Sequence, residues 1–205
     1  MNKLWGVLAA GVLAAFVASP ASAAIIFQDN FNRPNSNTVG NGWSEVENDA
    51  NDVAIVNGRL QLRDVLPTTI DAAASQLGGL SSVGLTNITL TYDWAPLTAS
   101  ESNDVLNVQW KRASSSTWIT LAVHGLGGSG SFTTNVVSLG AAAANVSNIQ
   151  IRFWTNVSQS DEGALIDNVK LTGDPIRVVP EPASMALLGV GLLGLGYLNR
   201  RRRIA

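Results

Sequence analysis

The sequence predicts an all-β protein, an antiparallel β-sandwich, and three observations lead to this fold class. Apolar and polar residues alternate with a period of two in many short segments between residues 25 and 172. The connections between these segments are rich in Gly, Ser, Asn and Thr, which are typical turn residues. The same span contains few segments with the 3.6-residue period of an amphipathic helix.

The expected strands can be taken in chain order. In the first, residues 25–31, Ile25, Phe27, Asp29 and Phe31 share one face. Next, Asn57-Gly58 separates two short apolar runs and predicts a β-hairpin, because both turn residues tolerate positive φ. Further strands are expected at residues 88–94, 106–110, 118–123, 132–139, 149–154 and 165–171.

Two segments are candidates for helix, residues 66–77 and the alanine run 141–144. We interpret both as loop with a turn of helix. The Gly-Asp-Pro sequence at 173–175 is expected to end the sandwich. The sequence therefore predicts one β-sandwich domain at residues 24–174, followed by a spacer at 175–179.

Residues 1–23 have the pattern of a secretory signal peptide. Met1-Asn2-Lys3 is a short basic start, and residues 4–17 are apolar. Ala21 and Ala23 form an A-x-A site before Ala24, which predicts cleavage by signal peptidase at this point. The leader predicts export through the inner membrane.

The C-terminal end contains a second apolar segment, residues 183–198, between a Pro-Glu-Pro motif and an arginine cluster. As a helix it would be about 24 Å long, enough for a single transmembrane helix in a thin membrane. The arginines are expected to stay on the cytoplasmic side. The motif is Pro180, Glu181 and Pro182, and the cluster is Arg200, Arg201, Arg202 and Arg203.

In order and spacing, residues 180–203 resemble the PEP-CTERM sorting tail of Gram-negative bacteria. The resemblance implies that an exosortase, a membrane protease, cuts at or near Pro-Glu-Pro. The protein would then be anchored transiently before it reaches the cell surface or extracellular matrix. The alternative is a permanent single-helix anchor.

Composition excludes several classes of function. Residues 24–180 contain eight Lys or Arg and fourteen Asp or Glu, a net charge of −6. This balance disfavours nucleic acid and anionic lipid as partners. The chain has no cysteine, which excludes thiol catalysis, cysteine zinc sites and disulfides. His124 is its one histidine, which excludes a multi-histidine metal centre.

Three pieces of the sandwich carry a second resemblance. Residues 27–33, 39–43 and 164–171 resemble the opening and closing strands of jelly-roll modules, such as galactose-binding-like, MAM-like and concanavalin-like domains. The resemblance implies a jelly-roll-like sandwich. Many such modules bind carbohydrate, which makes polysaccharide an expected ligand.

Two acidic residues stand at positions where the alternation predicts apolar ones. Asp29 falls on the face of Phe27 and Phe31, and Asp167 on the face of Leu165 and Val169. If the first and last strands are neighbours, as the resemblance implies, the two carboxylates would meet and would need a cation between them. We therefore expect a structural calcium ion held by Asp29 and Asp167, with Asn30 or Asn168 as helpers. The alternatives are a β-bulge that turns either side chain outward, or hydrogen bonds to loop amides.

A sugar site on a sandwich needs an aromatic face and polar groups for the hydroxyls. Trp118 and Trp154 lie opposite the aliphatic faces of their strands, and Arg152 shares the face of Trp154. These three residues are the predicted ligand-binding residues, the alternative being that a loop or the second sheet covers the rings. The same alternation places Trp94 and Trp110 in the core.

The sequence gives weaker indications of catalytic residues than of ligand-binding ones. Glu45 and Glu47 lie on one strand face, as a glycosidase pair can, but solvated surface acids are the better interpretation. His124 is interpreted as a loop or edge residue. We expect a non-enzymatic surface or matrix protein that binds polysaccharide. The alternatives are a purely structural surface protein with no small ligand and a secreted hydrolase.

Overall fold

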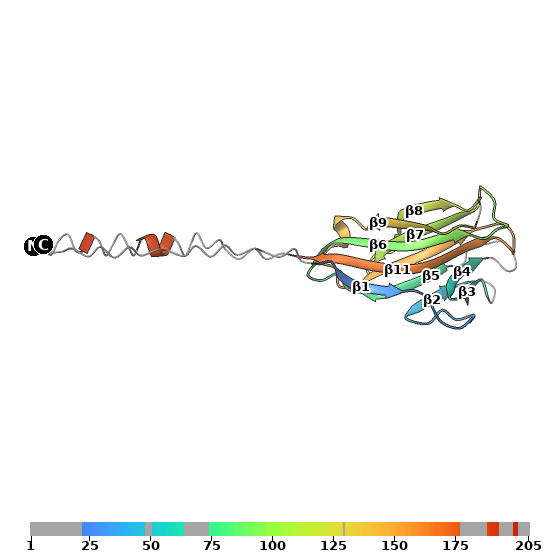
Figure 1. Ribbon diagram of the computed structural model, residues 1–205, viewed down its shortest axis with the longest axis horizontal. Coiled ribbons are helices and arrows are strands. Elements are labelled where there is room, and N and C mark those ends of the chain that lie inside the picture. Colours follow the sequence, from blue (N-terminus) through green and yellow to red (C-terminus); the bar gives the residue numbers. More distant parts are fainter. Residues whose placement is uncertain are drawn as a thin grey trace, which may run out of the picture.

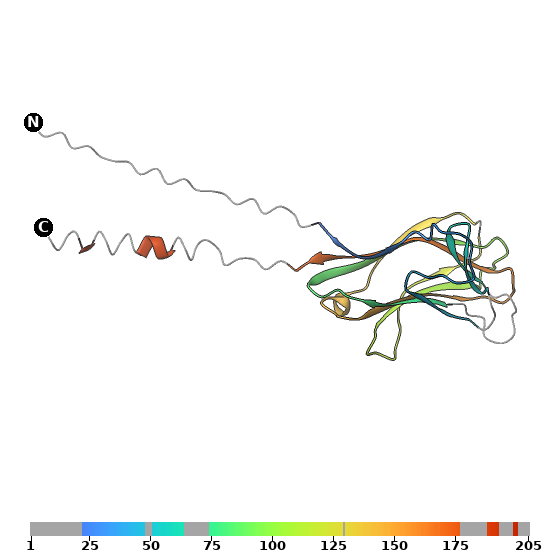
Figure 2. The same ribbon diagram turned by 90° about the horizontal axis from the view of Figure 1, so that it is seen from below.

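The computed structural model describes residues 22–47, 51–63, 74–128, 130–176, 188–192 and 199–200. The described strands form two antiparallel sheets packed face to face (Figures 1 and 2). This arrangement confirms the predicted antiparallel β-sandwich.

The six-stranded sheet is centred on the long strand β11, Gly163–Pro175. On one side β11 pairs with β6, Leu85–Pro96, and β6 pairs with the edge strand β9, Thr133–Ser138. On its other side β11 pairs first with β4 and then with β1, so two short strands share one edge. These strands are β1 (Ala24–Asp29), β3 (Val53–Val56) and β4 (Arg59–Arg63), with β3 outside β4.

The five-stranded sheet has the order β2-β5-β10-β7-β8. The turn between β7 and β8 projects away from the six-stranded sheet (Figure 2). Residues Ala141–Ala143 form the 3-10 helix η1, which confirms the turn of helix expected there. The strands are β2 (Trp43–Val46), β5 (Ala74–Leu80), β7 (Val105–Arg112), β8 (Ile119–Gly125) and β10 (Ile149–Asn156).

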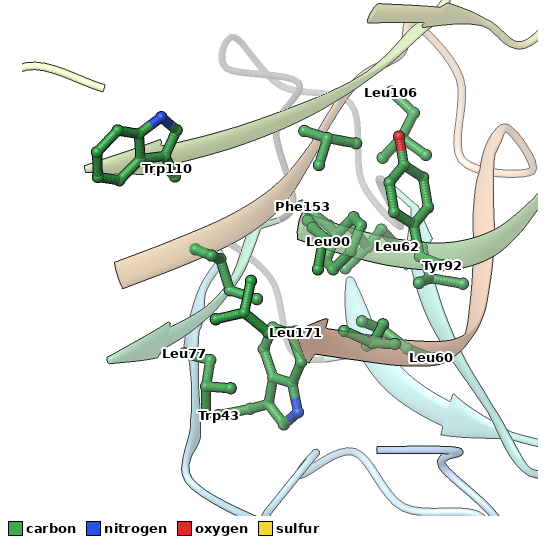
Figure 3. Close-up of a cluster of buried hydrophobic side chains, with 14 of the residues drawn as sticks. Trp43, Leu60, Leu62, Leu77, Leu90, Tyr92, Leu106, Trp110, Phe153 and Leu171 are labelled. Carbon is green, nitrogen blue, oxygen red and sulfur yellow. The ribbon is translucent and has the colours of Figure 1, made fainter. Parts of the chain in front are cut away.

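The core lies between the sheets and is built from alternate residues of the central strands (Figure 3). This alternation confirms the predicted inward faces of β6, β7 and β10, and it confirms Trp110 as a core residue. Trp94 is only partly buried at the edge of the core. The inward residues of the three strands, at most 1% exposed, are Ile88, Leu90, Tyr92, Leu106, Val108, Trp110, Ile149, Ile151 and Phe153.

Two strand predictions are wrong. Residues 74–77, expected as loop with a turn of helix, belong to β5, which lies between β2 and β10 and has no apolar alternation in its sequence. In β8 the expected core face exposes Ile119 and Val123 by 48% and 57%. The physical reason is that β8 is an edge strand whose pairing with β7 shifts register between Val108 and Gln109, which changes the phase.

Ala24 at the start of β1 lies opposite Gly173 near the end of β11. The described chain therefore enters and leaves the sandwich at the same end (Figure 2). Most of the predicted signal peptide, the Pro-Glu-Pro motif and Arg201–Arg203 lie outside the described residues. Of the apolar segment, residues 188–192 are helical, and within the described parts of the chain no helix is long and apolar enough to cross a membrane.

Candidate functional site

The three predicted ligand-binding residues meet on the outer face of the five-stranded sheet. Arg152 and Trp154 point outward from β10, and Trp118 lies directly before β8. The Cζ atom of Arg152 is 4.2 Å from the ring centroid of Trp118 and 5.9 Å from that of Trp154. All three side chains are half-buried.

A row of hydrogen bonds across three strands holds Arg152 in place. Arg152 lies opposite Gln109 on β7, which lies opposite Thr120 on β8. The Nε of Arg152 donates to Oε1 of Gln109 at 2.6 Å, and Nε2 of Gln109 donates to Oγ1 of Thr120 at 3.0 Å. The side-chain amide of Gln109 accepts from Arg152 through its oxygen and donates to Thr120 through its nitrogen. Gln109 therefore holds the guanidinium of Arg152 against Trp118.

A second cation completes the group. The Nζ of Lys111 lies 4.9 Å from the ring centroid of Trp118. We call Lys111, Trp118, Arg152 and Trp154 the cation–tryptophan cluster. Arg152 is half-buried, and this burial lowers the pKa of its guanidinium.

Sequence reasoning placed Trp118 as a stacking surface for a ligand, whereas the structure shows two cations over its ring. Trp118 therefore contacts both cations, and Trp154 is the ring farther from Arg152. Lys111 and Gln109 were missed as site residues. Their outward alternation with the core residues of β7 was the signal that could have found them.

Asp29 is the centre of a separate buried network. Its side chain is 3% exposed and forms an ion pair with Arg33, whose Nη1 and Nη2 donate to the two carboxylate oxygens at 2.8 and 3.1 Å. The Phe31 amide, the Asn41 side chain and Nε1 of Trp43 also donate to Asp29, at 2.8, 3.1 and 3.0 Å. The network ties the end of β1 to the loop that leads into β2.

The donors around Asp29 outweigh the effect of burial on its pKa. Burial alone would raise the pKa of this carboxyl. The hydrogen bonds from Arg33, Asn41 and the Phe31 amide, together with the charge of Arg33, hold the pKa below its usual value. Asp29 therefore stays ionised in the folded protein at neutral pH.

Asp167 does not occupy the core face that the alternation predicted. The pairing of β11 with β6 shifts register after Asp167, and Asn168 adopts a φ of 49°. This β-bulge changes the phase, so Ile166 is buried and Asp167 is half-buried opposite Asp93. Burial, with the charges of Asp93 and Asp29, raises the pKa of Asp167 against the lowering effect of the Asn168 amide and Arg59.

These surroundings do not fit a calcium ion at Asp29. Both carboxylate oxygens accept hydrogen bonds, and a guanidinium already neutralises the charge. The described residues also contain no group of three or more His, Asp or Glu side chains placed to hold a metal.

The calcium prediction has a direct test. We expect the melting temperature to be the same in EDTA and in millimolar calcium, because the guanidinium of Arg33 already neutralises the Asp29 carboxylate. Thermal unfolding followed by circular dichroism measures this. A calcium-dependent rise that disappears in Asp167→Ala would instead support the predicted calcium site.

A polar hollow of about 450 Å³ lies beside the Asp29 network. Gln28, Arg33, Asn168 and Lys170 are among the residues that line it.

The catalytic candidates are engaged in structural contacts. Tyr92 OH lies 2.7 Å from Nε2 of His124, whose ring stacks on Trp94 with 4.3 Å between centroids. Burial raises the pKa of Tyr92 to about 12 and lowers that of His124, so the imidazole is neutral at pH 7. Glu45 and Glu47 accept hydrogen bonds from the amides of Val39 and Val53.

Comparison with solved structures finds other β-sandwiches. The K3 cleaved adhesin domain of Lys-gingipain from Porphyromonas gingivalis aligns with a TM-score of 0.52 and 12% identity, over 73% of this chain and 100% of that one. A structure reported with endo-acting O-glycanases of human gut microbiota aligns at 0.50 with 8% identity, over 75% and 100%. A family 29 carbohydrate-binding module aligns at 0.48 with 11% identity, over 80% and 97%. At these identities the first two alignments show the fold alone.

No curated protein matches the chain. The C-terminal end, however, matches a protein-family model beyond the sandwich. Residues 178–203 carry the PEP-CTERM protein-sorting motif.

Proposed function

We propose that this protein is an exported surface or matrix protein that binds polysaccharide through the cation–tryptophan cluster. The observation that carries the proposal is the meeting of Trp118, Arg152 and Trp154 on the outer face of one sheet. Residues that are 36 positions apart in the sequence form this group only through the pairing of β10, β7 and β8.

The chemistry of the cluster suits a sugar chain. The half-buried ring of Trp154 can stack on the apolar face of a sugar ring, as aromatic side chains do in ligand sites. Arg152 and Lys111 supply donors for ring oxygens and hydroxyls. Because Gln109 already holds Arg152, little side-chain freedom is lost on binding.

The sorting motif supports delivery to the cell surface. A PEP-CTERM tail implies processing by an exosortase, after transient anchoring in the membrane. We propose that signal peptidase removes residues 1–23 during export and that exosortase acts at Pro180-Glu181-Pro182. Since β1 begins and β11 ends at the same end of the sandwich, an anchored protein would keep both sheet faces clear of its tether.

We further propose that the protein is non-enzymatic. Glu45 on β2 accepts from the loop amide of Val39, Glu47 accepts from the amide of Val53 at the start of β3, and His124 is held between Tyr92 and Trp94. These contacts support structural roles for the three residues that the hydrolase alternative requires.

The test is binding of Trp154→Ala to a panel of immobilised polysaccharides. We expect the wild type to bind at least one member and the variant to bind it about tenfold more weakly, because a stacking ring is lost. Phe132→Ala is the matched control, since Phe132 is an exposed ring with Arg59 4.7 Å from its centroid but lies outside the cluster.

If both variants lose the same affinity for the polysaccharide, or if Trp154→Ala loses none, the polysaccharide binds outside the cation–tryptophan cluster. A wild type that binds nothing on the panel would favour the purely structural alternative. Melting curves of both variants separate lost binding from lost folding.

A further inference from the structure

The cation–tryptophan cluster contains two positive charges and no negative one. Arg152 and Lys111 both lie over Trp118. Among the described residues the structure shows one ion pair, between Arg33 and Asp29 in the separate buried network. The two cations of the cluster are therefore not neutralised within the described protein.

The outward positions of the same sheet explain this imbalance. By strand register the described outward residues of β7 and β10 around the cluster are Asn107, Gln109, Lys111, Gln150, Arg152 and Trp154, and none is acidic. On the opposite sheet, Asp93 and Asp167 face each other across β6 and β11. Arg152 and Lys111 thus lie among outward residues of β7 and β10 that include no acid, in a domain whose sequence is acidic overall.

Arg152 is placed to bind an anion. Its one hydrogen bond to a described residue uses Nε and ends on Gln109, and a guanidinium has five donors in a planar fork. The fork matches carboxylate and sulfate oxygens, and such charge-assisted bonds are stronger than those to neutral hydroxyls. A half-buried charge without a counter-ion is also costly, and a bound anion removes that cost.

We propose that the polysaccharide bound at this face is acidic, with a carboxylate or sulfate group between Arg152 and Lys111 and a sugar ring over Trp154. This inference rests on the proposed function and names the class of ligand. A neutral glycan would supply no counter-ion to two cations that have none among the described residues. An acidic glycan can pair its anionic group with Arg152 and Lys111 while one of its sugar rings stacks on Trp154.

The net charge of the domain restricts how an acidic polysaccharide can be bound. With −6 over residues 24–180, long-range electrostatics repel an acidic chain. Binding must therefore come from short-range contacts at the two cations, which act within a Debye length of about 8 Å. Removing either cation is expected to weaken binding strongly, whereas a lysine on the other face should matter little.

The experiment is isothermal titration calorimetry of the full chain, in a detergent without a sugar headgroup, against matched glycans. One pair is oligogalacturonate and its carboxyl-reduced counterpart; the other is a sulfated galactan oligosaccharide and its desulfated form. We expect at least one acidic member to bind tenfold or more tightly than its neutral partner. Arg152→Gln should remove this preference while keeping a donor for Gln109, and Lys111→Met should reduce it.

Lys170→Met is the matched control, because Lys170 is exposed on the outer side of β11 in the other sheet. Equal binding of acidic and neutral members, lost in Trp154→Ala, would overturn the acidic ligand and leave the proposed function standing. Acidic binding that survives Arg152→Gln or is lost in Lys170→Met would also overturn it. Failure of every glycan to bind would overturn both.

Discussion

Asp29→Ala is expected to destabilise the protein by about 3–5 kcal/mol, the cost typical of breaking a buried ion pair by removal of one partner. Five donor contacts converge on this carboxylate, from Arg33, Phe31, Asn41 and Trp43. Their removal leaves the buried indole N–H of Trp43 and the partly buried guanidinium of Arg33 without an acceptor. Urea unfolding followed by fluorescence measures the loss.

The neighbouring Asn30→Ala is the control for this prediction. Asn30 is exposed and its side chain accepts one exposed hydrogen bond, from the Asn32 amide, so we expect a loss below about 1 kcal/mol. A loss in Asp29→Ala no larger than that of the control would contradict the role given to the network.

The same network predicts a pH dependence. The pKa of Asp29 is lower in the folded protein than its usual value of 3.8. The stabilisation from its ionised form is therefore fully present above about pH 4 and is lost as pH falls through the folded-state pKa. Asp29→Asn should show a shallower fall in the free energy of unfolding below pH 4 than the wild type, and equal slopes would refute the assignment.

Gly163→Ala is expected to cost 3 kcal/mol or more, or to prevent folding, because the start of β11 leaves no room for a side chain. A Cβ on Gly163 would clash with the Leu62 carbonyl oxygen and lie 2.9 Å from Cα of Arg63, both backbone atoms of β4. The glycine cannot shift easily. Its N–H donates to Ser100 Oγ at 2.8 Å, and its carbonyl accepts from the Leu97 amide at 2.9 Å.

Gly125→Ala provides the comparison. Gly125 also lies in a strand, but a Cβ there would meet only the Ser102 carbonyl oxygen, at an ordinary 3.8 Å. We expect a change within about 1 kcal/mol, measured by the same urea titration. Similar stability of the two variants would show that the contact between β11 and β4 is looser than described.

The sequence predicted the fold well where strands are central and regular. β6, β7 and β10 are each paired on both sides, and their inward residues alternate without interruption from Ile88 to Tyr92, Leu106 to Trp110 and Ile149 to Phe153. Alternation failed at bulges, because one extra residue changes the phase between the side chains before it and those after it. Across the bulge at Asn168 the buried positions are Ile166 and Val169, so Asp167 lies off the core face.

The candidate site could be predicted only in part. Alternation within β10 correctly put Arg152 and Trp154 on one face, since both belong to one strand. The contribution of Lys111 depends on the register between β10 and β7, which no local pattern specifies. For Asp29, sequence reasoning found the buried carboxylate but not Arg33 four residues later, because a loop returns that side chain to it.

The central claim is that polysaccharide binds on the outer face of the five-stranded sheet. The most direct measurement is an NMR titration of the ¹⁵N-labelled chain with the glycan that binds best, following the indole N–H signals of its six tryptophans. We predict that Trp118 and Trp154 shift, that Arg152 Nε–H shifts with them, and that the fully buried Trp110 does not. Shifts confined to the hollow around Gln28, Arg33 and Lys170 would contradict the account.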